Sequence, residues 1–316
     1  MTTNNRLYYT YSNYLKNLYN DKVYKLPVNL PVTCPNRIDG AGCSFCAEVG
    51  TGFEMLSNTI EVKEQLLKNR DYIKNKYKAN KFIAYFQNYT NTFLPLEDFK
   101  KYVKEALIED VVEIAISTRP DCIREDYLEF LSTLKKEKGI NITIELGLQT
   151  VNYHTLQKIK RGHTLGEYID AVLKIKMYEF KICTHLILNL PEDNEDDAKE
   201  SAKILSALGI DYVKLHSLYV AKNTEMAYLY ENNKISLCSK NEYIERVILF
   251  LEYLNPNISI QRLLGRAPNE ETIFCNWDTS WWKIKDEIEL IMNKRGTYQG
   301  KKYNYLNGSG LRKGCY

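Results

Sequence analysis

Short apolar runs alternate with longer amphipathic stretches along almost the whole chain. The apolar runs are rich in valine and isoleucine, a composition that is typical of buried parallel strands. The pattern predicts strands over Val23–Leu30, Phe82–Gln87, Val111–Ser117, Ile142–Leu148, Ile182–Asn189, Tyr212–Leu218 and Ile258–Leu263.

Between these runs, apolar residues recur at the spacing of an amphipathic helix, as Ala198, Ala202 and Leu205 do. The pattern predicts helices over Val62–Tyr77, Leu96–Ile108, Glu125–Lys136, Asn152–Lys160, Leu165–Tyr178, Asn194–Leu208, Lys240–Leu254 and Ser280–Lys294. Repeated strand–helix alternation predicts an α/β fold with a parallel sheet and right-handed crossovers. Because each repeat is roughly 30 to 40 residues long, we expect a partial or full (β/α) barrel, whose chemistry lies at the carboxyl ends of the strands.

No linker or low-complexity segment divides the 316 residues. We predict an N-terminal segment over residues 1–20, a barrel domain over 21–265 and a short C-terminal extension over 266–316, a helix and tail packed on the barrel. No apolar run approaches the roughly eighteen residues that cross a membrane, and the polar N-terminus does not resemble a signal peptide. We therefore expect a cytoplasmic protein with no membrane partner.

Positive charge is concentrated in the last part of the chain. Residues 281–316 carry eight lysines and arginines against three acidic residues, a local charge of +5 in a chain whose net charge is +3. Tyr298, Tyr303, Tyr305 and Tyr316 are interleaved with these charges. A basic, aromatic stretch suits nucleic acid, although a solvated terminal segment explains it equally well.

Three cysteines, Cys34, Cys43 and Cys46, lie close together after the first predicted strand, with the spacing C-x8-C-x2-C. Thiolates are soft ligands that favour iron–sulfur clusters, zinc or copper(I). Three thiolates leave one iron of a four-iron cluster open. A structural zinc site is an alternative, although such sites usually have four ligands and no second C-x2-C pair is present. Buried thiols without a metal are the other alternative. The remaining cysteines are scattered, and we predict none of them as a ligand: Cys122, Cys183, Cys238, Cys275 and Cys315.

This motif and the phrases after it resemble the radical S-adenosylmethionine superfamily. The usual spacing there is C-x3-C-x2-C, and the longer first gap is similar to that of the branch related to the Elongator catalytic subunit. A stand-alone bacterial family of that branch resembles the chain nearly end to end, through the phrases KVYKLPVNLPVTCPNR, GCSFC, YFQNYTNTF, ISTRPDC, IELGLQT, KIKRGHT, THLILNLPED, VKLHSLYV and RGTYQG.

The resemblance implies a barrel of the radical S-adenosylmethionine type, a [4Fe–4S] cluster and S-adenosylmethionine. Cys34, Cys43 and Cys46 would bind three irons, and the open iron would hold S-adenosylmethionine, whose reductive cleavage yields a 5′-deoxyadenosyl radical. The resemblance and the positions near strand ends predict cofactor-binding residues, namely Gln87, Thr90, Asn91, Ser117, Arg119, Glu145, Gln149, Arg161 and His185. Asn189 and Glu192 stand where the family usually has glycines.

Three of these assignments have simpler alternatives. Arg119 would be a surface residue in a turn, Arg161 would meet the dipole at a helix C-terminus, and His185 would be a core histidine bonded to a carbonyl. In the sixth and seventh predicted strands, Lys214, His216 and Arg262 are candidates for contacting the substrate, if their face lines the barrel.

For the substrate, the resemblance points to transfer RNA. It implies conversion of a carboxymethylaminomethyl group on C5 of the wobble uridine to aminomethyl, with electrons from a donor such as flavodoxin or ferredoxin. Two alternatives stay open. One is a radical enzyme for a small, porphyrinogen-like molecule, and the other is a metal-binding protein without enzymatic activity.

Overall fold

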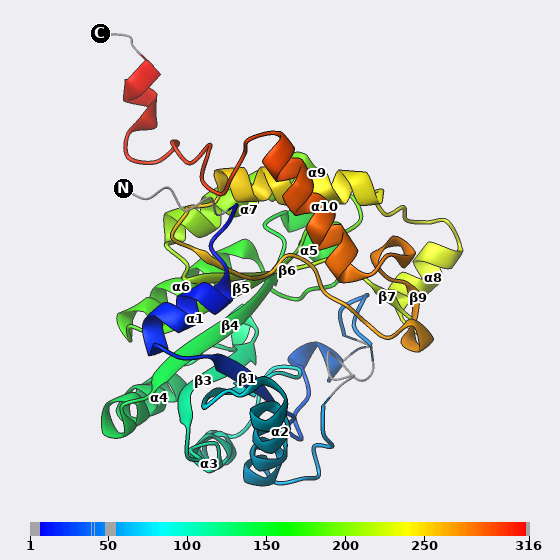
Figure 1. Ribbon diagram of the computed structural model, residues 1–316. Helices are drawn as coiled ribbons and strands as arrows, with labels where there is room; N and C mark the ends of the chain where they lie inside the picture. The colour runs from blue at the N-terminus through cyan, green and yellow to red at the C-terminus, as the bar shows by residue number, and fades with distance from the viewer. Residues whose placement is uncertain (1–6, 39, 41, 48–54, 314–316) are drawn as a thin grey trace.

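A curved, seven-stranded parallel sheet forms the centre of the computed structural model, which describes residues 7–38, 40, 42–47 and 55–313 (Figure 1). The strand order is β1-β2-β3-β4-β5-β6-β8. The bounds are β1 (Val23–Val28), β2 (Lys81–Phe86), β3 (Val111–Thr118), β4 (Asn141–Gln149), β5 (Lys181–Ile187), β6 (Tyr212–His216) and β8 (Ser259–Arg262). Each strand lies where the apolar runs predicted it, and the barrel is the partial form, because β1 and β8 do not pair within the described residues.

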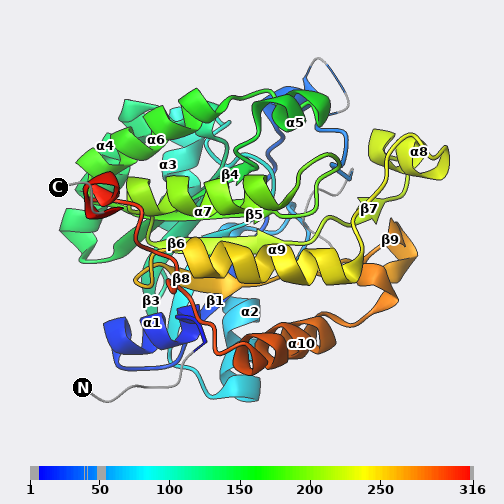
Figure 2. The same cartoon turned by 90° about the horizontal axis from the view of Figure 1, so that it is seen from above.

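Helices cover the outer face of this sheet, as Figure 2 shows from above. Their bounds are α2 (Val62–Tyr77), α3 (Leu96–Glu105), α4 (Glu125–Lys138), α5 (Tyr153–Lys158), α6 (Leu165–Met177), α7 (Glu195–Leu208), α9 (Lys240–Tyr253) and α10 (Trp281–Lys294). Fully buried side chains such as Leu66, Phe99, Tyr168 and Leu205 join these helices to the sheet. Burying apolar surface on this scale is the main free-energy gain of the fold.

A ninth helix, which the apolar pattern did not predict, lies at the open side of the partial barrel. Helix α1 (Tyr11–Tyr19) contacts both β8 and β1. Just before it, Thr10 forms a parallel bridge with Ile260 of β8. Residues 10–19 of the predicted N-terminal segment therefore lie against both edges of the sheet.

A small antiparallel sheet adds to the carboxyl end of the barrel. It consists of β7 (Val220–Ala221) and β9 (Thr272–Phe274), and the short helix α8 (Glu225–Glu231) contacts β7. Figure 1 places these elements beside the segment that carries the cysteines.

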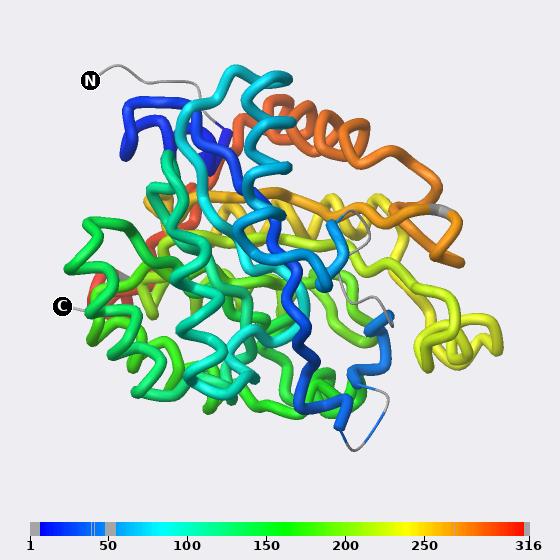
Figure 3. The backbone as a smooth tube through the Cα atoms, turned by 90° about the horizontal axis from the view of Figure 1, so that it is seen from below, coloured from blue at the N-terminus to red at the C-terminus, as the bar shows by residue number. Residues whose placement is uncertain are grey.

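The basic tail lies at the other end of the molecule from the cysteine segment. Figures 1 and 3 both show the chain after α10 on the side opposite the segment around residues 34–46. There Tyr305 donates a hydrogen bond to the carbonyl of Tyr253 at the end of α9, at 2.7 Å. Cys315 and Tyr316 lie outside the described residues. Within the described ranges, no helix has the length and apolar character that crossing a membrane requires.

Candidate active site at the carboxyl ends of the strands

A cavity of about 710 Å³ lies inside the sheet at the carboxyl ends of its strands. It is lined by every residue that the sequence predicted for the site except Asn91, namely Cys34, Cys43, Cys46, Gln87, Thr90, Ser117, Arg119, Glu145, Gln149, Arg161, His185, Lys214, His216 and Arg262. Residues that are far apart in the sequence meet here because parallel strands end at one edge of the sheet.

Asn91 is buried beneath this lining rather than part of it. Its side-chain amide donates to the carbonyls of Phe86, Asn88 and Ser117, at 3.0, 3.1 and 2.8 Å. These bonds tie the loop after β2 to the end of β3. Asn91 therefore holds the loop that carries Thr90, and its binding of the cofactor stays a prediction.

The cysteine segment is anchored to the loop between α5 and α6. The backbone N–H of Ser44 donates to the carbonyl of Ile159 at 3.0 Å. The Asn36 amide donates to the carbonyls of Lys160 and Arg161, at 3.0 and 2.9 Å. Gly162 permits this approach, because its φ is +77° and a Cβ there would lie 2.3 Å from Asn36 Oδ1. A larger residue at this position of the KIKRGHT phrase would therefore clash with Asn36.

Each of the three thiols faces a different arginine. Arg119 Nη1 lies 3.8 Å from the sulfur of Cys34, and Arg161 Nη1 lies 3.6 Å from that of Cys43. Arg37 Nη2 lies 3.3 Å from the sulfur of Cys46. A guanidinium beside a thiol favours the thiolate, which is the form that binds metal.

Arg37 was not among the residues predicted from the sequence. Its position in the turn Pro35–Arg37, directly after Cys34, was the available signal. Burial raises the pKa of the Cys46 thiol above its ordinary value, and the hydrogen bond from Arg37 opposes that effect. Arg37 therefore supports the charged form of a thiol that burial alone would keep neutral.

All three arginines are held by further hydrogen bonds, and Arg37 donates to the carbonyl of Cys46 at 2.9 Å. Arg119, which is only 2% exposed, binds both carboxylate oxygens of Asp121, at 2.8 and 2.6 Å. Arg161 donates from Nη2 to the carbonyl of Gly147 at 2.7 Å. Neither simpler alternative describes them, because Arg119 is not at the surface and Arg161 points across the cavity instead of capping α5.

Gln149 and Ser117 stand at the ends of β4 and β3. Gln149 has a φ of 78°, and the pairing of β4 with β5 shifts register just before it. The Ser117 hydroxyl donates to the Tyr85 hydroxyl at 3.1 Å. The irregular end of β4 places the Gln149 side chain in the cavity lining, beside Gly147 and Arg161.

A charged cluster forms the floor of the cavity, around the fully buried carboxylate of Glu145. The Lys25 ammonium group and the Gln261 amide contact one oxygen of this carboxylate. His185 Nε2, at 2.8 Å, and Lys214 Nζ, at 3.5 Å, contact the other. Burial works to raise the pKa of Glu145, but the two ammonium groups and His185 hold it well below its ordinary value. Glu145 is therefore a carboxylate with several partners, and Lys25 is a member of the cluster that sequence reasoning missed.

The two histidines of the floor are neutral at physiological pH. Burial, followed by the charge of Lys214, lowers the pKa of His185 to about 4. Burial and the charge of Arg262 hold the pKa of His216 well below its ordinary value. Burial also lowers the pKa of Lys214 to about 8, although Glu145 opposes this shift. His185 contacts Glu145 and lines the cavity, so it is not bonded to a backbone carbonyl as the simpler alternative supposed.

The loop after β5 accommodates the residues that replace the usual glycines. Glu192 takes a left-handed conformation, with φ at 75°, and forms an ion pair with Lys158. Asn189 is buried, and its Oδ1 accepts a hydrogen bond from the N–H of Leu218 at 2.6 Å. Both replacements therefore have a defined place in this loop.

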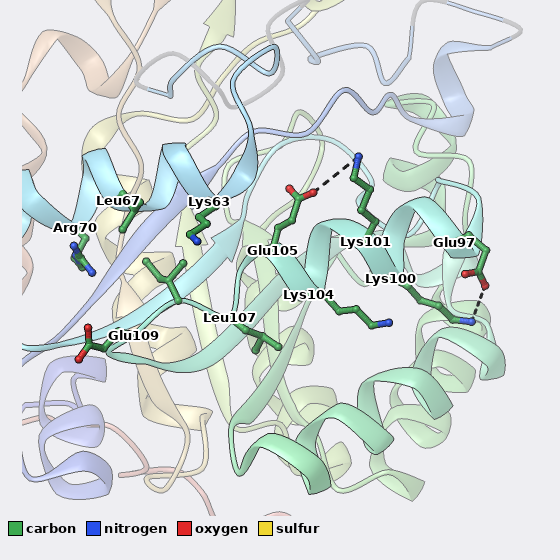
Figure 4. Close-up of a pocket in the computed structure, with 11 residues that line it drawn as sticks. Lys63, Leu67, Arg70, Glu97, Lys100, Lys101, Lys104, Glu105, Leu107 and Glu109 are labelled. Carbon is green, nitrogen blue, oxygen red and sulfur yellow. Dashed lines mark hydrogen bonds and ion pairs between the residues drawn. The ribbon is translucent and has the colours of Figure 1, made fainter.

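A second concavity, of about 830 Å³, lies outside the barrel between α2 and α3 (Figure 4). Both lysines and glutamates line it, and Lys100 pairs with Glu97 at 2.8 Å. Lys101 lies 4.0 Å from Glu105, the other contact drawn in the figure. None of the predicted site residues lines this groove, and its mixed charges are those of an ordinary solvated surface.

Known proteins resemble the chain over nearly its whole length. Residues 28–205 match the Radical SAM superfamily, and residues 210–294 match the Radical_SAM C-terminal domain. The protein YtqA of Bacillus subtilis (strain 168) is 33% identical over 304 residues, which cover 95% of this chain and 94% of that protein.

Two further likenesses concern a known enzyme and a solved structure. The tRNA uridine(34) acetyltransferase of Methanocaldococcus jannaschii is 28% identical over 164 residues, which cover 51% of this chain and 29% of that protein. The structure of the archaeal Methanocaldococcus infernus Elp3 has a TM-score of 0.69 at 18% identity, over 88% of this chain and 64% of that one. At that identity the likeness shows a common fold.

Proposed function

The chain belongs to the radical S-adenosylmethionine superfamily, and on that basis we propose that it modifies the side chain on C5 of the wobble uridine in tRNA. The proposed reaction converts carboxymethylaminomethyl to aminomethyl. The chain is an enzyme that uses a [4Fe–4S] cluster and S-adenosylmethionine, which sets aside the zinc site and the metal-binding protein without activity.

The residues that we propose as cluster ligands fit a cluster with one open iron. Cys34, Cys43 and Cys46 line one cavity, and each thiol has a guanidinium neighbour. Among the described residues of that lining there is no fourth cysteine. When bound, the cluster and S-adenosylmethionine supply a 5′-deoxyadenosyl radical that abstracts hydrogen from an unreactive C–H bond.

We propose that other lining residues bind and orient S-adenosylmethionine. We assign the predicted cofactor-binding residues of this lining to S-adenosylmethionine, because they line the same cavity as the cysteines, namely Gln87, Thr90, Ser117, Arg119, Glu145, Gln149, Arg161 and His185.

The observation that carries the choice of substrate is the likeness to an enzyme that acts on uridine 34 of tRNA, together with a cavity that has an unusually cationic floor. The proposed partners are tRNA and an electron donor such as flavodoxin or ferredoxin. Both place the protein in the cytoplasm.

Nucleoside mass spectrometry of total tRNA from a deletion strain tests this proposal. Loss of the gene should raise the carboxymethylaminomethyl form at the wobble position and remove the aminomethyl form, and the gene on a plasmid should restore it. A plasmid with Cys43→Ala should not. An unchanged wobble-uridine profile would contradict the tRNA proposal and favour the small-molecule alternative.

A further inference from the structure

One cation on the floor of the cavity has no anionic partner among the residues that the structure describes. Arg262, at the end of β8, is half-buried because the tip of its side chain faces the cavity. Its Nε is enclosed, without a hydrogen-bond partner in the structure. Its Nη2 lies 2.6 Å from Nδ1 of His216, which burial and the charge of Arg262 itself keep neutral. Leaving an enclosed guanidinium unpaired is costly, so this group is arranged to meet an anion.

The neighbouring groups cannot supply that anion. Glu145 is the one carboxylate of the described floor residues, and Lys25 and Lys214 already pair with it. Two cations of the floor, Lys214 and Arg262, together with Lys25 behind it, therefore stand against one carboxylate. No carboxylate lies within 4.0 Å of Arg262 in the described part of the chain.

Arg262 and Lys214 also lie between two cavities. Both line the central cavity. Both also line a third cavity, of about 760 Å³, that extends towards α1, β1 and α10. The sulfur atoms face other arginines, Arg37, Arg119 and Arg161. The open guanidinium is thus set apart from the groups that hold the cysteines.

We propose that Arg262, assisted by Lys214, binds a carboxylate of the substrate. A guanidinium has a planar fork that matches the two oxygens of a carboxylate. Resting on the proposed function, this assigns the floor to the terminal carboxylate of the carboxymethylaminomethyl group. Arg262 is then a specificity residue, which distinguishes the acidic substrate from the uncharged or aminomethyl form.

Binding without turnover tests the assignment. The protein carries its cluster and S-adenosylmethionine but receives no reductant. The probes are synthetic anticodon stem-loop RNAs with the wobble uridine as the free acid or as its methyl ester, followed by fluorescence anisotropy. The native protein should bind the acid at least about tenfold more tightly than the ester, the size expected for a charge-assisted contact.

The substitution Arg262→Met should remove this preference and leave the affinity for the ester unchanged. Arg262→Lys should restore part of it, since the charge remains without the fork. Lys214→Met should weaken the binding of the acid less than Arg262→Met does. Arg70→Met, the same change in the groove outside the barrel, should leave the preference intact.

Several results would overturn the assignment. One is an equal loss for acid and ester in Arg262→Met. Another is weaker binding of S-adenosylmethionine with an intact acid preference. Competition by inorganic phosphate but not by acetate would assign the floor to phosphate instead. If Arg262→Met does not fold, the preference for the acid over the ester is compared between the native protein and Arg262→Lys. An equal preference in these two proteins would then overturn the assignment.

Adding reductant separates this inference from the proposed function. Acid-selective binding through Arg262 without any change in the wobble side chain would leave the carboxylate site standing and remove the reaction. If the side chain is converted and Arg262→Met still prefers the acid, the proposed reaction would stand and the carboxylate site at Arg262 would be wrong.

Discussion

At the scale of single residues, the site is organised by arginines that face sulfur and by lysines that face one carboxylate. The cysteines, Arg119 and Arg161 were predictable, because a motif and a family resemblance mark them. Arg37 and Lys25 were not, since each acts through a neighbour that only the fold brings close. Asn91 was predicted to bind the cofactor from the family resemblance of the loop after the second strand, and its amide group also donates to backbone carbonyls.

Arg37 should raise the reduction potential of the cluster by placing positive charge beside the Cys46 sulfur. We expect Arg37→Gln to lower the potential by about 60 mV, which equals about 1.4 kcal/mol for one electron. Redox titration followed by electron paramagnetic resonance measures this. Arg124→Gln is the control, because that arginine is exposed and paired with Asp126. An unchanged potential in Arg37→Gln would contradict the assigned role.

Asp193 links stability to pH. Burial raises the pKa of its carboxyl to about 6, against 3.8 as the ordinary value, and Thr155 donates a hydrogen bond to it at 2.6 Å. The folded protein therefore holds this proton more tightly than the unfolded chain does. The contribution to the free energy of unfolding is lost as pH rises from about 4 to above 6.

Asp193→Asn removes that titration. Relative to the native protein, the variant should gain about 1 kcal/mol of stability between about pH 5 and about pH 7.5. Denaturant unfolding at the two pH values measures the difference. A difference that does not change with pH would show that Asp193 titrates alike in both states.

At the scale of elements, length decided what could be predicted. The parallel strands were found because buried strands such as β2 are apolar at almost every position. Strands β7 and β9, with two and three residues, are too short to carry a pattern. Helix α1 was not predicted, because Leu15 is its one buried residue and tyrosines occupy much of its surface. The loops that form the site follow from the strand order rather than from their own composition.

Gly162 connects the α5–α6 loop to the cysteine segment, and a methyl group there should disturb it. Gly162→Ala places a Cβ against Asn36 at a residue whose φ is +77°. We expect less iron and sulfide per chain after reconstitution, and a loss of stability of roughly 1–3 kcal/mol. Gly139→Ala is the matched control, since its φ is +64° but nothing lies within 4 Å of the added Cβ. That control should cost about 1 kcal/mol and leave iron incorporation unchanged.

At the scale of the whole molecule, the first described residues meet helix α10 and the segment after it, beside the gap between β1 and β8. Tyr8 donates to Glu289 of α10 at 2.7 Å, and Gln299 donates from its backbone N–H to the carbonyl of Leu7 at 2.8 Å. The amino-acid pattern did not predict these contacts, because they join residues almost three hundred positions apart. The division into an N-terminal segment, a barrel and an extension stays a prediction.

The side chains of Tyr8 and Glu289 should be energetically coupled through their hydrogen bond. Tyr8→Phe and Glu289→Gln should each lower the free energy of unfolding by about 1 kcal/mol, because each removes one hydrogen bond. In the double variant the losses should not add, since both remove the same bond. Chemical denaturation of the four proteins measures the coupling, and full additivity would mean that the bond contributes nothing.

We propose that this chain uses radical chemistry on the wobble uridine of tRNA. The most direct measurement incubates the reconstituted protein anaerobically with S-adenosylmethionine, reductant and tRNA from the deletion strain. Nucleosides and 5′-deoxyadenosine are then quantified. We predict that aminomethyluridine appears together with 5′-deoxyadenosine, and that Cys43→Ala yields neither. Formation of 5′-deoxyadenosine without any change in the wobble uridine would contradict the claim.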